Sequence, residues 1–362
     1  MDRCQAAADP AWSGFAAMIW FWLGFFALVA LLLFLDLGVL HRRAAEPSLK
    51  SAVGWTIGWI CLGLSFSGVV YLIYEHAWLG ARMAAAPGHG QAIGVPPGGG
   101  SDAAITYVAG YLLEQALSID NIFVMSLLFR SFHVPARYQH RVLFWGILGA
   151  IGFRISMLGG GAFLAKHFTW VFYLFGAYLG WQGIKLLRGG DDDDGDHDKS
   201  LAIRGMRRFV RIVDGDHGGK FTVQIDGRRA LTTVAVCLVV IELTDIVFAL
   251  DSIPAVLAVS QDTFIIITSN IFAIMGLRSL YFVLAGAMAK FKYLKIALAV
   301  LLVLIGVKLV LHDVADVSHT VTLAVIAGVI GAGVIASVIS SRRAELAEGA
   351  EGAEPVEPAE PG

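Results

Sequence analysis

Residues 231–256 read LTTVAVCLVVIELTDIVFALDSIPAV, and this stretch decides the class of the protein. It is long enough to cross a bilayer, because a spanning helix needs about 20 mostly apolar residues. It also carries three carboxylates, at Glu242, Asp245 and Asp251, which are costly inside lipid. A long apolar segment with acids in its middle predicts a membrane helix with a functional centre.

The rest of the chain has the same apolar character. Of its 362 residues, 57% are hydrophobic and only 15% are charged, and the mean hydropathy is +0.70. Soluble domains average about 45–50% apolar and about 25% charged residues, so a water-soluble globule is excluded. We expect an all-α polytopic membrane protein with about nine transmembrane helices. These lie near residues 15–40, 51–74, 103–129, 140–164, 168–187, 231–256, 263–289, 294–312 and 319–340.

Basic residues indicate which way the helices run. Lys and Arg gather in the odd-numbered connections, such as Arg42 and Arg43 after the first span and the cluster between residues 188 and 229 after the fifth. Because basic loops stay in the cytoplasm, we expect the amino terminus outside and the carboxy terminus inside, in the plasma (inner) membrane. The net charge of −2 offers no basic face to nucleic acid, which is excluded as a partner.

Three segments are not expected to span. Residues 77–102 are rich in Ala, Gly and Pro and predict a flexible external loop. The cytoplasmic loop 188–230 contains Asp226-Gly227 between β-forming residues, which predicts a small hairpin. The acidic tail 344–362 has a composition typical of disorder. The transmembrane domain is thus expected to occupy residues 1–340.

The chain contains an internal repeat of three spans. The third to fifth spans match the sixth to eighth in three places, which follow in the same order with similar gaps. A three-span unit enters the membrane from opposite sides in its two copies, as in the inverted repeats of many secondary transporters. The matched runs are 114–122 with 245–253, 152–154 with 276–278, and 183–186 with 306–309.

Six acids lie within the expected spans: Asp36, Glu114, Asp120, Glu242, Asp245 and Asp251. Each uncompensated one would cost about 2.5–3.5 kcal/mol, so they are expected to be paired, hydrated, protonated or bound to metal. Arg154 and Arg278 lie near mid-span and are candidates for internal ion pairs. Two deep cations leave a surplus of carboxylate oxygen, which favours a functional ion site.

Helical spacing indicates which side chains converge. Two sets share a helix face at 100° per residue: Glu114, Ser118 and Asn121 in the third span, and Glu242, Asp245 and Ser252 in the sixth. Asp120 and Asp251 point away from these faces, so straight helices cannot bring all the acids together. Pro254 predicts either an ordinary kink or an unwound turn whose carbonyls serve as ligands.

The donors near these acids are oxygens. Carboxylates, Asn side chains and backbone carbonyls suit hard cations such as Mg²⁺, Ca²⁺ or Mn²⁺. Asn270 and Ser269 either add oxygens or satisfy their own helix. Cys237 is interpreted as a small packed hydrophobe, so a soft-metal site is not expected.

The same residues carry a resemblance to a known family. The runs EQALSIDN at 114–121, ELTDIVFALDSIPA at 242–255 and TSNIFAIMGLRSLYF at 268–282 resemble the signatures of the TerC family. The resemblance extends over the nine spans and omits the acidic tail. Small departures at residues 256–257 and 232–233 touch no expected ligand.

The resemblance implies a function and a set of residues. The most similar members, of the Alx type, are regarded as manganese exporters, and the family is named for tellurium resistance. By resemblance, Asp36 matches a first-span acid of Alx-like members. The positions that correspond to the family's acidic motifs, expected as metal ligands, are Glu114, Asp120, Asn121, Glu242, Asp245 and Asp251.

The sequence therefore leaves two alternative functions. The first is a transporter that exports a hard divalent cation, with Mn²⁺ implied by the resemblance, and whose metal release couples to protons. The second is a membrane scaffold that assembles or metalates other proteins and depends on the loop 188–230 and the tail. No enzyme and no permanently bound cofactor is expected. The expected partners are the lipid bilayer and the divalent ion, and a homo-oligomer is compatible with the sequence.

Overall fold

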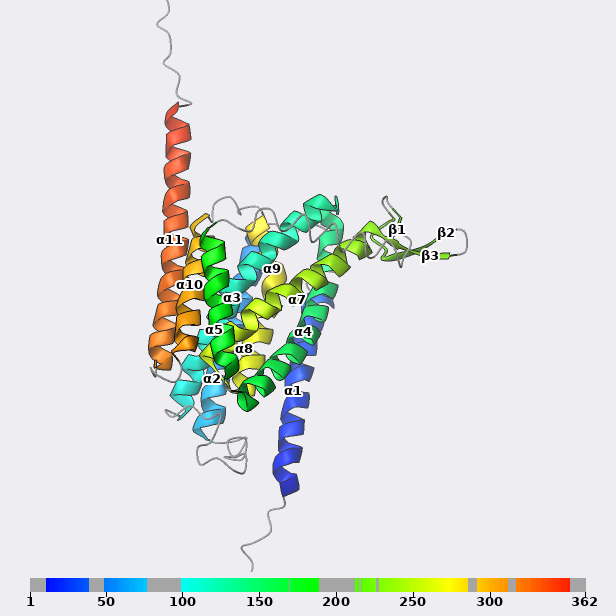
Figure 1. The fold of residues 1–362 in the computed structure, drawn as a ribbon. Coiled ribbons are helices and arrows are strands. Elements are labelled where there is room, and N and C mark those ends of the chain that lie inside the picture. Colours follow the sequence, from blue (N-terminus) through cyan, green and yellow to red (C-terminus); the bar gives the residue numbers. More distant parts are fainter. Residues whose placement is uncertain are drawn as a thin grey trace, which may run out of the picture.

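In the computed structural model the protein is a bundle of long helices with a small sheet at one side (Figure 1). The structure describes residues 11–38, 49–76, 99–168, 170–188, 212–213, 215, 217–225, 228–285, 292–311 and 317–351. The helices are α1 (Ala11–Gly38), α2 (Leu49–Glu75), α3 (Gly99–Ser131), α4 (Ala136–His167), α5 (Trp170–Leu187), α7 (Thr233–Val259), α8 (Thr263–Met275), α9 (Leu277–Ala285), α10 (Lys292–Val310) and α11 (His319–Glu351). The strands are β1 (Ile212–Val213), β2 (Thr222–Ile225) and β3 (Arg228–Thr232).

These helices coincide with the stretches expected to span. Within the described residues, six helices are long and apolar enough to cross a membrane, and the bent pair α8 and α9 adds a seventh if it is one span. Helices α1 and α5 are not among the six. The all-α polytopic class is confirmed, whereas the count of nine crossings stays a prediction.

The outer surface of the bundle is apolar. Large hydrophobic side chains stand out from several helices, including Trp20 (73% exposed), Phe34 (67%) and Ile335 (61%). Water would leave such surfaces unstable, whereas lipid chains solvate them. The surface therefore fits an integral membrane protein.

Two helices differ from the sequence prediction. The expected span 263–289 is broken at Gly276, where α8 and α9 meet at 43°. A Cβ at Gly276 would lie 3.3 Å from Trp59 Cβ, so the missing side chain permits close approach of α2 at the bend. The unwound turn considered at Pro254 is not observed, because α7 continues through Pro254 to Val259.

The start of α3 and the end of α11 also differ from the boundaries expected from the sequence. Helix α3 begins at Gly99, inside the expected external loop 77–102, and residues 77–98 lie outside the described part. Helix α11 continues to Glu351, inside the tail expected to be disordered, and residues 352–362 lie outside the described part. Helical propensity of Ala, Glu and Arg accounts for the extension of α11.

The described chain begins and ends at opposite ends of the bundle. Figure 1 shows α1 starting at the lower end and α11 finishing at the upper end. Neighbouring contacts also give relative directions: α4 and α7 are parallel, since Gly146 approaches Ile241 and Gly161 approaches Ile253. Both arrangements fit an odd number of crossings in which the fourth and sixth spans run the same way.

Helices α5 and α10 pack backbone against backbone. A Cβ added at Gly176 would lie 2.7 Å from the carbonyl oxygen of Gly306, and one at Gly183 would lie 2.7 Å from that of Ala299. The repeat expected from the sequence would pair Gly183 with Gly306 and hence Gly176 with Ala299. Under that pairing, exchanging the copies turns one contact into the other, as in a two-fold interface.

The sheet precedes α7. Strands β2 and β3 form the antiparallel hairpin expected from the sequence, with Thr222 opposite Leu231 and Ile225 opposite Arg228. The turn residues 226–227 lie outside the described part. Strand β1 adds a short parallel partner to β3 that was not predicted. Arg141 of α4 holds the sheet's base, because its Nη1 donates to Gly219 O at 3.1 Å and its guanidinium lies over the Phe221 ring.

Candidate ion site

Helix α3 occupies the middle of the bundle and contacts α2, α7, α8 and α11. Its residues Glu114, Ser118 and Asn121 are 0%, 0% and 3% exposed, so the face expected from their spacing is buried. An ionised carboxylate at this depth requires a charged or hydrogen-bonding partner. Helices α4, α7 and α8 supply the partners.

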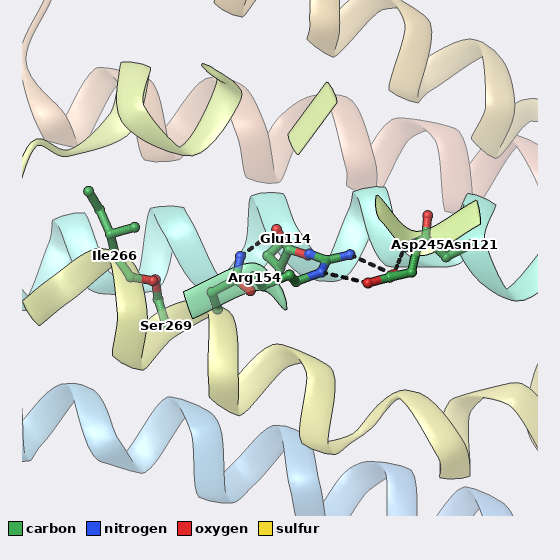
Figure 2. A network of polar contacts seen from close by, with 7 residues as sticks. Glu114, Asn121, Arg154, Asp245, Ile266 and Ser269 are labelled. Carbon is green, nitrogen blue, oxygen red and sulfur yellow. Dashed lines mark hydrogen bonds and ion pairs between the residues drawn. The ribbon is translucent and has the colours of Figure 1, made fainter. Parts of the chain in front are cut away.

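Arg154 of α4 joins Glu114 to Asp245 of α7 (Figure 2). Its Nη1 donates to Glu114 Oε1. Its Nη2 and Nε donate to Asp245 Oδ1 and Oδ2 at 3.2 and 3.3 Å, a two-pronged contact that fixes the guanidinium plane. Two carboxylates and one guanidinium leave the cluster with a formal charge of −1.

Two amide side chains complete the hydrogen bonds. Asn121 Nδ2 donates to Asp245 Oδ1 at 3.3 Å, and Asn270 Nδ2 of α8 donates to Glu114 Oε2 at 2.8 Å. Ser269, the neighbour of Asn270, instead donates to its own helix at Ile266 O (Figure 2). Of the two α8 residues considered from sequence, Asn270 joins the cluster and Ser269 satisfies backbone.

Buried oxygens without partners in the described part of the chain lie on the helices α3 and α8 that contribute to this network. Among the described residues, Ser118 Oγ and Asn270 Oδ1 are buried without a hydrogen-bond partner. Gln115 Oε1, one residue from Glu114, is in the same condition. Buried oxygens without partners are rare in folded proteins and commonly mark a bound water or ion. The site therefore has donor oxygens available beyond its ion pairs.

Glu242 lies three residues before Asp245 on α7 and is half-buried. Its carboxylate packs on Gly149 of α4, where an added Cβ would lie 2.5 Å from Glu242 Cδ. Within the described part of the chain, Glu242 Oε2 has no hydrogen-bond partner. Glu242 is thus a third carboxylate beside the cluster, without a described counter-charge.

A small pocket lies between α3 and α7 next to the cluster. It is too narrow to hold a water molecule, and Asn121, Thr244 and Asp245 are its polar lining residues. The remaining lining side chains are apolar: Val124, Met125, Leu128, Ile241 and Phe248. Asp245 and Asn121 thus border a narrow gap between the two helices.

The other expected residues fall in different places. Ser252 is buried on α7 at 3% exposure. Arg278 is buried on α9, and its described contact is with His140 Nε2 at 3.0 Å, so it lies away from the Arg154 network. The side chains of Asp36, Asp120 and Asp251 lie outside the described part of the structure. The described side chains contain no group of three or more His, Cys, Asp or Glu arranged to hold a metal.

Sequence reasoning missed two residues of this region. His140 has an ordinary place at the start of α4, and nothing in its spacing connects it to Arg278. Gly149 is one of many glycines in the sequence. Its contact with the Glu242 carboxylate depends on how α4 packs on α7. No pattern within a single helix reports such an inter-helix contact.

Comparison with known proteins identifies the family of this chain. The sequence model described as "Integral membrane protein TerC family" matches residues 99–345, which include every helix of the cluster. The chain belongs to the TerC family. As a TerC protein it is integral to a membrane.

Several relatives resemble this TerC protein along most of its length. An uncharacterized membrane protein of Myxococcus xanthus is 41% identical over 323 residues, covering 89% of this chain and 93% of its own. A protein of Escherichia coli K12, named as a candidate membrane-bound redox modulator, Alx, is 38% identical and covers 85% and 91%. A membrane protein of Rickettsia bellii is 34% identical and covers 88% and 97%. No solved structure matches the chain.

Proposed function

We propose that this TerC protein is a secondary transporter that exports a hard divalent cation from the cytoplasm, with Mn²⁺ as the first candidate. In this proposal the chain lies in the plasma membrane with its amino terminus outside and its carboxy terminus in the cytoplasm. The bilayer and the ion are its partners, and the ion is substrate rather than a resident cofactor.

The observation that carries the proposal is the convergence of Glu114 and Asp245 in the middle of an apolar bundle. Intramembrane acids that face the bundle interior generally belong to ion or proton pathways. The surrounding donors are oxygens, including Asn121, Ser118 Oγ and the unpartnered Asn270 Oδ1. A donor set of carboxylate, amide and hydroxyl oxygen suits Mg²⁺, Ca²⁺ and Mn²⁺ rather than softer metals.

Alternating access is supported by the arrangement of the helices. The acids lie on α3 and α7, the first helices of the two proposed repeats, and α5 meets α10 in a reciprocal contact. Rocking of one three-span unit against the other would expose the carboxylates to one side at a time. Protonation of neighbouring carboxylates would help to release the metal, since like charges favour proton uptake.

Manganese and the outward direction rest on the family resemblance alone. The relatives named Alx are described as redox modulators, and that description is theirs. A thiol pair for such a role is absent from the described residues, where Cys61 of α2 and Cys237 of α7 are both free.

The test is metal content and Mn²⁺ tolerance in a transport-deficient host that expresses the wild type, Glu114→Gln or Asp245→Asn at matched membrane levels. The wild type is expected to lower cellular manganese and restore growth, and both variants are expected to fail. Glu75→Gln is the matched control, because Glu75 Oε2 accepts from Gly100 N at the end of α2 and an amide oxygen can do the same. Equal behaviour of all four proteins for every metal would end the transporter proposal and favour a scaffold acting through residues 188–230 and the tail.

A further inference from the structure

Arg154 contacts most of the carboxylate oxygens that a metal ion would bind. Its guanidinium contacts three of the four carboxylate oxygens of Glu114 and Asp245. The fourth, Glu114 Oε2, accepts from Asn270. A cation that binds both carboxylates would therefore meet the guanidinium at the same oxygens.

The net charge of the cluster also disfavours simultaneous binding of the guanidinium and a divalent ion. With Arg154 in contact, the two carboxylates and the guanidinium have a net charge of −1. A divalent ion bound to the same oxygens beside the guanidinium would raise that charge to +1 in a buried site. If the guanidinium leaves, the divalent ion and the two carboxylates are neutral, which is the least costly arrangement away from water. Arg154 and the metal ion thus compete for the carboxylates of Glu114 and Asp245.

The structure also supplies a second acceptor for Arg154. Glu242 lies one helical turn from Asp245 on α7, and its Oε2 has no partner among the described residues. Its carboxylate rests on α4 at Gly149, one to two turns before Arg154 on the same helix. Asp245, which Arg154 contacts, and Glu242 lie three residues apart on one face of α7, so Glu242 lies one helical turn from the present partner of the guanidinium.

We propose that Arg154 is a tethered cation that competes with the transported ion, occupying Glu114 and Asp245 when the ion has left and shifting to Glu242 when the ion binds. This inference rests on the proposed transport function. Arg154 is accordingly a positioning residue, which sets affinity and permits release, and it is not itself a ligand. Glu242 is its alternative partner rather than a primary ligand.

The experiment measures Mn²⁺ binding by calorimetry to the full chain in nanodiscs, and Mn²⁺ flux in proteoliposomes. Arg154→Gln removes the competing charge and is expected to bind Mn²⁺ about tenfold more tightly while its flux falls. Glu242→Gln keeps Arg154 but removes the carboxylate to which its guanidinium would shift. This variant is expected to bind Mn²⁺ more weakly. Arg141→Gln is the matched control on α4, since Arg141 contacts Gly219 and Phe221 of the sheet base. Its Mn²⁺ affinity is expected to equal that of the wild type.

A chemical test separates competition from a merely structural role. In Arg154→Ala, free guanidinium ion is expected to weaken Mn²⁺ binding in a concentration-dependent way, while the wild type is insensitive to it. Size-exclusion profile and melting temperature identify any variant that fails to fold, and Arg154→Lys then replaces it, with tighter Mn²⁺ binding again expected because an ammonium cannot make the two-pronged contact.

Different results would overturn the role of Arg154 and the transport function. Unchanged or weaker Mn²⁺ binding in folded Arg154 variants, with a wild type that binds and transports, overturns the tethered-cation role and leaves the transport function standing. Guanidinium-insensitive binding in Arg154→Ala overturns it likewise. A wild type that neither binds nor moves Mn²⁺ or another divalent cation overturns the proposed function itself.

Discussion

At the scale of single residues, the buried cluster depends on a few contacts between helices. Glu114 and Asp245 are stabilised by Arg154, Asn121 and Asn270, each from a different part of the chain. Removing one partner of a buried charge costs more than the pair contributes, because the other charge is left without compensation. Single substitutions here therefore have large and diagnostic effects.

Asn270→Ala is expected to destabilise the protein by about 1–3 kcal/mol, because Glu114 Oε2 loses its only described donor in a buried site. Ser269→Ala, the adjacent control, removes only a bond to the carbonyl of its own helix and is expected to have a much smaller effect. Thermal unfolding in detergent measures both. Equal losses for the two variants would contradict the special role of Asn270.

Gly149→Ala is expected to lower ion transport several-fold with little loss of stability, because the added methyl group displaces the Glu242 carboxylate and only the flexible end of that side chain has to move. Gly152 lies on the same helix with open space around it. Gly152→Ala is expected to be neutral or stabilising by about 0.5–1 kcal/mol through helix propensity. Flux assays and melting curves compare the pair, and unchanged flux in Gly149→Ala would show that transport does not depend on the position of the Glu242 carboxylate.

At the scale of elements, the contact between α5 and α10 is the closest helix pairing described. Gly176, Gly183 and Gly306 allow it, because any side chain there would meet the facing backbone. In a membrane, small residues replace the hydrophobic effect as the basis of helix association by permitting close van der Waals packing.

Gly306→Ala and Gly183→Ala are expected to destabilise the protein by similar amounts, about 1–3 kcal/mol each, because both face a carbonyl oxygen 2.7 Å from the added Cβ. Gly328→Ala in α11, which faces open space, is the control and is expected to change little. Melting temperature in detergent gives the comparison. A large effect from only one of the two α5–α10 variants would argue against a reciprocal contact.

At the scale of the whole molecule, the two ends of the described chain lie at opposite ends of the bundle (Figure 1). An odd number of crossings produces this arrangement, and the distribution of Lys and Arg predicts which end is cytoplasmic. The sheet at the base of α7 belongs to the connection with the most basic residues.

Single cysteines placed near the two termini, in a chain whose own three cysteines are replaced, are expected to react with a membrane-impermeant thiol reagent from opposite sides. The amino-terminal label should form in intact cells, and the carboxy-terminal label only after lysis, because the basic connections stay inside. A cysteine in the β2–β3 hairpin should behave like the carboxy-terminal one. Labelling of both termini from one side would require an even number of crossings.

The sequence by itself determined the membrane class, the hairpin and the family. These follow from local properties: apolar length, turn chemistry and motif spacing, which each segment carries alone. The buried face with Glu114, Ser118 and Asn121 also followed, because helical periodicity is a local property.

Only the tertiary structure decided how the acids are compensated. In the structure, Arg154 contacts both Glu114 and Asp245. Arg278 contacts His140, and the Glu242 carboxylate packs on Gly149. The structure also breaks the helix at Gly276 and leaves α7 continuous through Pro254. The physical reason is that these features depend on the approach of helices distant in sequence, and the energy of a buried charge is set by which neighbour reaches it.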